Sequence, residues 1–198
     1  MKDFCLRRTT NFITQYKDFT PQELEELQYG LEGLYLTLTK TIIILSVSYF
    51  LGILKETLII LVFFNFLRFT GFGFHANNSI QCLILSTILF SILPFIFLNV
   101  KITYWIEYFI IMISILTFLL YAPADTVKRP LTNKKKRTIR KYFTVLFASI
   151  YTVFIILYKE NDISTLLSMS LLIEAIMVHP LTYRIFRQPY RNYKDYDV

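Results

Sequence analysis

Residues 80–121 form two apolar runs, IQCLILSTILFSILPFIFLNV and ITYWIEYFIIMISILTFLLY, which Lys101 separates. Each run approaches the roughly 20 residues that an α-helix needs to cross the hydrocarbon core of a bilayer. Four further apolar segments occupy residues 41–54, 57–67, 142–158 and 163–181. The sequence therefore predicts an all-α, polytopic membrane protein with about six transmembrane helices. Pro94 is expected to kink the helix of residues 80–100.

The composition agrees with a membrane protein. Of the 198 residues, 55% are hydrophobic and 18% are charged, whereas soluble domains carry about 25% charged residues. The net charge of +7 would suit nucleic-acid binding in a soluble protein. Here the basic residues lie between apolar segments, so membrane topology explains them and no nucleic-acid partner is expected. No repeat or Pro/Gly-rich linker divides the chain, so we predict one domain over residues 1–198.

The distribution of basic residues predicts the orientation. With the amino terminus inside, all but three of the 21 lysines and arginines lie on the inner side, and the exceptions are Lys55, Lys101 and Lys159. This asymmetry follows the positive-inside rule. We therefore expect a multi-pass protein of the cell membrane whose two termini, the loop of residues 68–79 and the basic loop of residues 122–141 are cytoplasmic.

Residues 1–36 are polar but patterned. Thr20, Pro21 and Glu23 form a typical helix start, with Thr20 as the N-cap. Leucines then recur at helical spacing, at positions Leu24, Leu27, Leu31, Leu34 and Leu38. Such a stripe fits a helix on the membrane surface or on a partner helix, and equally well ordinary packing within the chain. We predict amphipathic cytoplasmic helices over 1–36, a transmembrane bundle over 37–181 and a cytoplasmic tail over 182–198.

Reactive groups gather in residues 68–82, which read RFTGFGFHANNSIQC. This run holds one of the two histidines, His75, and one of the two cysteines, Cys82. A thiol and an imidazole are the minimum equipment of a cysteine nucleophile with its base. On one straight helix the two residues would lie about 10 Å apart along the axis, so they form a working pair only where the helix breaks.

The sequence supplies such a break. Gly71 and Gly73 permit a tight turn, and residues 77–79 are helix-capping types. If Asn78 or Ser79 caps the third apolar segment, Cys82 lies in the first turn of that helix and the preceding loop can fold back onto it. Helix amino termini and nearby cations stabilise a thiolate. His179 is a less favoured alternative base, because no thiol is near it in the sequence.

Metal and cofactor chemistry is not expected. The two histidines and two cysteines are scattered along the chain without a recognised ligand spacing. The second cysteine, Cys5, lies in the charged amino-terminal segment.

Several charged residues have two readings each. Glu174 lies deep in the last apolar segment, where it either pairs with a buried arginine or polar backbone, or handles substrate. Arg68 could add positive charge near the thiol or hold a substrate carbonyl. The basic loop contains Lys134, Lys135 and Lys136, which enforce topology and would also attract anionic lipid or an acidic peptide segment.

Two functions other than catalysis fit the same residues. A small transporter or peptide exporter would line its path with Glu107, Glu174 and Pro94. A noncatalytic membrane assembly or sensor protein would use the leucine stripe at 24–38 to bind partners.

Three motifs resemble those of the accessory gene regulator protein B (AgrB) family, and the resemblance covers essentially the whole chain. They are Arg68 with Gly73-x-His75-Ala76 and Cys82, Ala122-Pro123-Ala124 followed by Lys128-Arg129-Pro130, and Ile173-Glu174-Ala175-Ile176 before Pro180.

The resemblance implies a membrane cysteine endopeptidase of Gram-positive quorum sensing that works without a cofactor. Such an enzyme cleaves a short pro-peptide, AgrD, near its carboxyl end through a thioester. The peptide's own Cys or Ser then attacks the thioester and closes a thiolactone or lactone. In this chain Cys82 would be the nucleophile and His75 the general base and acid, while Arg68 and Gly73 match positions associated with activity. Family members are expected to form homodimers in the lipid bilayer.

Overall fold

The computed structural model describes residues 2–16, 19–75, 78–100, 103–126, 130–159 and 161–195. Within these ranges the regular structure is helical, apart from isolated bridge residues, which include the pair Phe72 and Ala124. The elements are α1 (Lys2–Thr14), α2 (Pro21–Phe50), α3 (Leu54–Gly71), α4 (Ser79–Thr87), the π-helical η1 (Ile88–Ile92), α5 (Leu93–Val100), α6 (Tyr104–Tyr121), α7 (Lys134–Leu157), α8 (Asp162–Val178), α9 (Pro180–Ile185) and the 3-10 turn η2 (Asn192–Asp195). The predicted all-α fold is confirmed.

Four helical stretches of the described chain are long and apolar enough to cross a membrane. They are Gln22–Phe50, Ser79–Val100, Tyr104–Tyr121 and Lys134–Leu157. The apolar helices α3 and α8 are not among them, since α3 carries Lys55, Glu56 and Arg68 and α8 has 17 residues. The chain is thus a membrane protein, and the number of six crossings stays a prediction.

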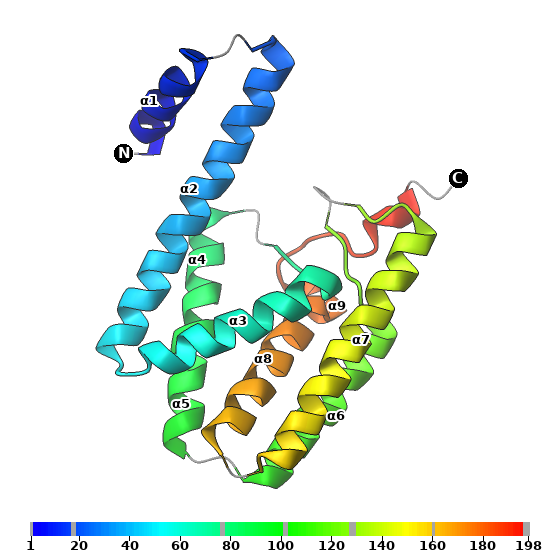
Figure 1. Cartoon of the computed structure of the whole chain (residues 1–198). Coiled ribbons are helices and arrows are strands. Elements are labelled where there is room, and N and C mark those ends of the chain that lie inside the picture. The colour runs from blue at the N-terminus through cyan, green and yellow to red at the C-terminus, as the bar shows by residue number, and fades with distance from the viewer. Residues whose placement is uncertain are drawn as a thin grey trace.

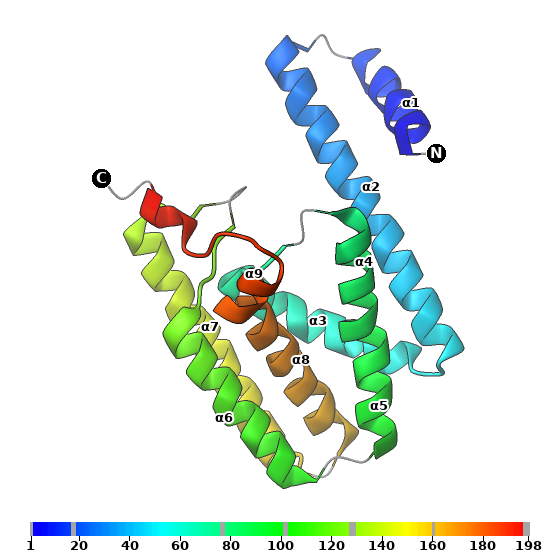
Figure 2. The ribbon, with the colours of Figure 1, turned by 180° about the vertical axis from the view of Figure 1, so that it is seen from behind.

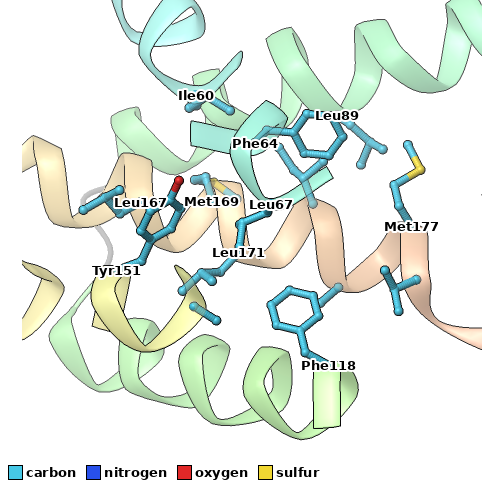
Figure 3. Close-up of a cluster of buried hydrophobic side chains, with 14 of the residues drawn as sticks. Ile60, Phe64, Leu67, Leu89, Phe118, Tyr151, Leu167, Met169, Leu171 and Met177 are labelled. Carbon is cyan, nitrogen blue, oxygen red and sulfur yellow. The ribbon is translucent and has the colours of Figure 1, made fainter. Parts of the chain in front are cut away.

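Helix α8 is the centre of the bundle. It contacts α3, α5, α6 and α7, as both views of the chain show (Figures 1 and 2). Side chains from three of these helices, Leu67, Phe118 and Tyr151, converge on Leu171 of α8 (Figure 3). Small side chains on α8, at Ser164, Ser168 and Ser170, are fully buried. Such residues let helices approach closely where lipid offers no hydrophobic drive for association.

Helix α2 projects beyond the bundle at its amino-terminal end, where α1 lies along it (Figures 1 and 2). The predicted start is confirmed, because the Thr20 hydroxyl accepts the Glu23 amide and the Glu23 carboxylate accepts the Thr20 amide. The helix then continues without interruption past residue 36 to Phe50. Leu34 and Leu38 are 56% and 54% exposed. The chain's own bundle therefore does not bury the carboxyl-terminal end of the leucine stripe. The proposed division at residue 36 falls within one helix.

The helix of residues 79–100 contains a π-helical turn just before Pro94. Proline has no amide hydrogen, so the Phe90 carbonyl four residues earlier loses its helical donor. The Thr57 hydroxyl of α3 lies 3.1 Å from that carbonyl oxygen and 2.9 Å from the Ser48 hydroxyl, and it can donate its single proton to either. Ser48 and Ser91 are in turn hydrogen-bonded at 2.9 Å. The disturbance predicted at Pro94 is thus a π-turn whose free carbonyl another helix satisfies.

Replacing Thr57 with valine keeps the shape of the side chain and removes this donor. We expect Thr57→Val to lower the free energy of unfolding in detergent by about 1–3 kcal/mol, because the buried Phe90 carbonyl is left unsatisfied. A thermal-unfolding measurement checks this. Thr41→Val is the matched control, since the Thr41 hydroxyl is bonded within exposed α2 and such changes stay within about 0.5 kcal/mol. Equal losses in both variants would contradict the role of Thr57.

Candidate functional site

Cys82 lies in the first turn of α4. The Asn78 side chain caps this helix by accepting a hydrogen bond from the Ile80 amide at 2.9 Å. The Cys82 amide donates to the Asn78 carbonyl at 3.0 Å, which is the first hydrogen bond of the helix. The predicted cap at Asn78 is confirmed, whereas Asn77 lies outside the described residues. The thiol is half-buried and is not in a disulfide.

His75 lies on the loop between α3, which ends at Gly71, and α4. Its side chain is exposed and hydrogen-bonded to the side chain of Cys82. The break between the two helices thus brings together two groups that one helix would hold about 10 Å apart. The Gln188 side chain donates to the His75 carbonyl at 3.1 Å, so the chain after α9 supports the loop.

A third group reaches the thiol from α2. The Lys40 ammonium nitrogen donates to the Cys82 sulfur at 3.2 Å, across 42 residues of sequence. Both side chains are half-buried. This contact was not predicted, because the sequence shows Lys40 only as one of the basic residues of the inner side. The available signal was a lysine at the start of the apolar half of a long helix.

Arg68 holds the loop that carries His75. Its two terminal nitrogens donate to the carbonyls of Phe72 and Phe74. Phe72 and Gly73 both have positive φ angles, of 59° and 102°, so the backbone reverses here and turns these carbonyls away from any helical donor. The guanidinium supplies these missing donors. The two roles that the sequence suggests for Arg68, positive charge near the thiol and binding of a substrate carbonyl, stay predictions.

The same loop pairs with two distant segments of backbone. The Gly73 amide donates to the Ala124 carbonyl at 2.6 Å, and the Phe74 amide donates to the Met177 carbonyl at 2.7 Å. In return the Ala124 amide donates to the Gly71 carbonyl at 3.0 Å. Two of the three motifs from the sequence thus have a structural link to the His–Cys loop. The stretch 122–124 and the end of α8 each provide a backbone carbonyl that accepts a hydrogen bond from the loop.

Phe74 anchors the loop through its side chain. The ring is buried against Phe186, with centroids 4.6 Å apart, and against Tyr183 at 5.8 Å. The Tyr183 hydroxyl donates to the Asp125 carbonyl at 2.9 Å and contacts the Ala124 carbonyl at 3.3 Å. Short helix α9 therefore fixes both sides of the pairing between the loop and residues 124–125.

Gly73 is required for steric and conformational reasons. A Cβ atom there would lie 2.9 Å from the Met177 carbonyl oxygen and would collide with the Arg68 guanidinium. The φ angle of 102° is also one that side-chain-bearing residues rarely adopt. Gly71 is similarly confined, since a Cβ atom would lie 2.6 Å from a carboxylate oxygen of Glu174.

Glu174 of α8 is fully buried behind the loop and forms an ion pair with Arg68. The nearest oxygen lies 3.8 Å from the Arg68 nitrogen, which is close enough for strong attraction and too far for a hydrogen bond. Within the described residues its two oxygens have no hydrogen-bond partner. The structure pairs Glu174 with the half-buried Arg68, and a role of Glu174 in substrate handling stays a prediction.

The basic patch lies apart from the thiol. Lys134, Lys135 and Lys136 are exposed in the first turn of α7. The starts of α4 and α7 lie at the same end of the molecule and are separated in both views (Figures 1 and 2). Lys128 and Arg129 of the predicted motif fall outside the described residues.

Glu107 is held away from the loop. It is buried near the start of α6 and accepts hydrogen bonds from Ser164 at 3.2 Å and Thr165 at 2.8 Å. Ser164 and Glu174 are ten positions apart on α8, or about 15 Å along its axis. Over this stretch α8 carries buried hydroxyls at Ser168 and Ser170 as well as buried apolar side chains such as Leu171. Glu107 and Glu174 are therefore two separate buried carboxylates with different partners.

The alternative base has another role. The Nδ1 atom of His179 caps α9 by accepting a hydrogen bond from the Leu181 amide at 3.1 Å, and the ring lies against Tyr121, with centroids 5.1 Å apart.

Within the described ranges no group of three or more His, Cys, Asp or Glu side chains is placed to hold a metal ion.

Comparison with known proteins identifies the family. The family described as accessory gene regulator B matches residues 6–178. A putative AgrB-like protein of Clostridium acetobutylicum is 33% identical over 176 residues, covering 88% of this chain and 84% of the relative. A putative AgrB-like protein of Listeria monocytogenes is 30% identical over 87% of this chain and 84% of its own length.

The accessory gene regulator protein B of Staphylococcus aureus is 28% identical over 158 residues, covering 80% of this chain and 83% of that protein. No solved structure matches the chain. The chain therefore belongs to the AgrB family of membrane proteins, which take part in processing a quorum-sensing peptide together with the AgrD pro-peptide.

Proposed function

We propose that the chain is a membrane cysteine endopeptidase that cleaves an AgrD-like pro-peptide near its carboxyl end and closes a thiolactone or lactone ring. The observation that carries the proposal is the hydrogen bond between His75 and Cys82 at the amino end of α4, in a chain of the AgrB family. A thiol activated by an adjacent imidazole is the arrangement that cysteine acyl transfer requires.

Cleavage proceeds through a thioester. The His75 imidazole takes the thiol proton, and the Cys82 sulfur attacks the scissile carbonyl carbon, so that a C–S bond forms and the carbonyl π electrons move to oxygen. Backbone amides at the start of α4 favour this oxyanion, because the amino end of a helix carries partial positive charge. When the intermediate collapses, the C–N bond breaks and the imidazolium gives its proton to the departing amine.

Ring closure is the reverse chemistry with a different nucleophile. The Cys or Ser of the bound peptide gives its proton to His75 and attacks the thioester carbon, forming a new C–S or C–O bond. The C–S bond to Cys82 then breaks, and the Cys82 thiolate recovers the proton from the His75 imidazolium. Exchange of one thioester for another costs little free energy, so a thiol nucleophile needs no further energy source. A site beside lipid limits the access of water, which favours ring closure over hydrolysis.

Arg68 and Glu174 are positioning residues in this proposal. Arg68 holds the carbonyls of Phe72 and Phe74, the second of which directly precedes His75, and Glu174 balances its charge from α8. Because a displacement of about 1 Å in a reacting group can lower a rate about 100-fold, the loop must be held firmly for His75 to serve Cys82.

The exposed Lys134, Lys135 and Lys136 suit an acidic segment of the pro-peptide. They occupy the amino-terminal turn of α7, where the helix dipole already favours anions, so the lysine charges and the dipole act in the same direction. In this proposal the peptide's leader lies on the membrane, its cleavage site reaches Cys82, and its acidic tail binds these lysines.

The orientation of the protein completes the proposal. The positive-inside rule assigns the basic start of α7 to the cytoplasm, and the start of α4 lies at the same end of the bundle (Figure 1). Cys82 would then act near the cytoplasmic face, with both termini inside, in a single-domain protein that works in the bilayer as a homodimer.

Removing either reacting group should abolish processing. In cells that co-express the pro-peptide, we expect Cys82→Ala and His75→Ala each to reduce processed peptide by at least about 100-fold, the lower bound for a lost acid or base. Mass spectrometry of the peptide checks this, with Cys5→Ala as the control that keeps activity. Normal processing by Cys82→Ala would refute the endopeptidase.

Arg68→Met should lower processing at least tenfold and destabilise the fold by about 3–5 kcal/mol, because it leaves the Glu174 charge buried without a partner. The double variant Arg68→Met/Glu174→Met removes both charges. We expect it to regain much of the thermal stability but not the processing, since the carbonyls of Phe72 and Phe74 still lack their donor. Recovery of processing in the double variant would contradict the positioning role of Arg68.

Lys134, Lys135 and Lys136 should affect cleavage only through the attraction between their charges and an acidic tail of the pro-peptide. Replacing Lys134, Lys135 and Lys136 together with glutamine should slow cleavage of a pro-peptide with an acidic tail by roughly tenfold at low salt, and less at 1 M salt, where the screening length is about 3 Å. A pro-peptide whose tail carries glutamine in place of its acidic residues is the control, and its cleavage should not respond to the lysines. An equal loss with both peptides would show that the patch does not bind the tail.

A further inference from the structure

We propose that Lys40 is a third catalytic residue, which pairs its ammonium charge with the Cys82 thiolate in both halves of the reaction. The inference rests on the proposed role of Cys82 as nucleophile and adds a residue from a helix outside the His–Cys run. Its basis is the direct contact of 3.2 Å between the Lys40 nitrogen and the reacting sulfur.

The contact is held in register by a second link between the same helices. Helix α2 and the helix of residues 79–100 run in the same direction along the molecule (Figure 2). Ser48 of α2 is hydrogen-bonded to Ser91 at 2.9 Å. Lys40 and Cys82 lie eight and nine positions before these serines, or about 12–14 Å along each axis. The buried hydroxyl pair thus fixes the register between the two helices, and in this register Lys40 lies opposite the Cys82 thiol.

The neighbouring polar side chains of α2 leave this contact to Lys40. Thr37, Thr39 and Thr41 all donate to carbonyls of their own helix. Lys40, in contrast, donates to a group on α4. A half-buried lysine in an apolar helix loses hydration, and its contact with the sulfur gains most when the sulfur carries negative charge, because a charged hydrogen bond is stronger than a neutral one.

Two cationic groups then face the sulfur from two elements, Lys40 from α2 and His75 from the loop after α3. When His75 has accepted the thiol proton, Lys40 stabilises the remaining thiolate before it attacks the carbonyl carbon. In the thioester the sulfur has no charge, and the ion pair is lost. When the peptide's own nucleophile displaces Cys82, the C–S bond electrons return to sulfur beside the Lys40 ammonium, so the same contact favours release of the ring.

Alkylation of Cys82 by iodoacetamide measures the thiolate without any peptide. The full chain carries Cys5→Ser so that Cys82 is its single thiol, and intact mass gives the rate at neutral pH and at an alkaline pH where every thiol is ionised. We expect Lys40→Met to slow alkylation at neutral pH by roughly three- to tenfold and to leave the alkaline rate nearly unchanged, because thiolate, not thiol, reacts. Lys40→Arg should restore the neutral rate.

Lys40→Gln separates charge from hydrogen bonding, because glutamine still donates but carries no charge; it should behave like Lys40→Met. Lys55→Met, at an exposed lysine of α3, is the matched control and should behave like the parent. A neutral-pH rate for Lys40→Met or Lys40→Gln equal to that of the parent would overturn the proposal. Equal slowing at both pH values would also overturn it, since that result indicates altered access to the sulfur.

The experiment is independent of the peptidase proposal. If Cys82→Ala still processed the pro-peptide, the endopeptidase would be refuted, whereas the effect of Lys40 on thiol reactivity would be measured as before. Conversely, processing could depend on Cys82 while the alkylation rate of Cys82 did not change in the Lys40 variants. That result would support the endopeptidase and refute the catalytic role of Lys40.

Discussion

The Arg68 guanidinium supplies hydrogen bonds that the backbone lacks where α3 ends and the chain turns toward α4. A helix that stops inside a membrane protein exposes carbonyls that neither lipid nor the helix itself can satisfy. Just beyond the helix, the carbonyls of Phe72 and Phe74 accept hydrogen bonds from Arg68, and Glu174 of α8 pairs with its charge. These contacts hold a non-helical loop, and that loop carries His75.

The loop is supported by the centre of the bundle. Helix α8 supplies Glu174 and the Met177 carbonyl, and it is also the helix around which α3, α6 and α7 pack. Gly71 and Gly73 let the loop approach this helix and residue 124 more closely than any side chain would permit. The same packed helices that stabilise the fold therefore determine where the imidazole lies relative to the thiol.

Local features of the site could be predicted from the sequence because they depend on neighbours in the chain. Helix geometry required a break between His75 and Cys82, and residue types identified the Asn78 cap; the structure confirms both. The capping box at Thr20 was predictable for the same reason. A glutamate in an apolar helix demands a cation, which made an arginine partner for Glu174 one of two expected outcomes.

Contacts between distant segments could not be predicted in this way. Periodicity shows that Lys40 lies on a helix but not which helix it faces, and its contact with Cys82 depends on the register between two helices. The acceptors at Ala124 and Met177 are backbone carbonyls, which every residue type has, so the side chains at these positions do not reveal them. The amphipathic stripe of α2 likewise did not reveal that Leu34 would remain exposed.

The most direct test of the account is to trap the acyl-enzyme. A pro-peptide whose internal Cys or Ser is replaced by alanine can be cleaved but cannot close its ring, so the thioester should accumulate on the purified protein. Intact-mass and peptide-mapping measurements should then find the amino-terminal part of the peptide attached to Cys82 through a bond that hydroxylamine breaks. Cleavage of this peptide with no adduct, or with an adduct on another residue, would contradict the account.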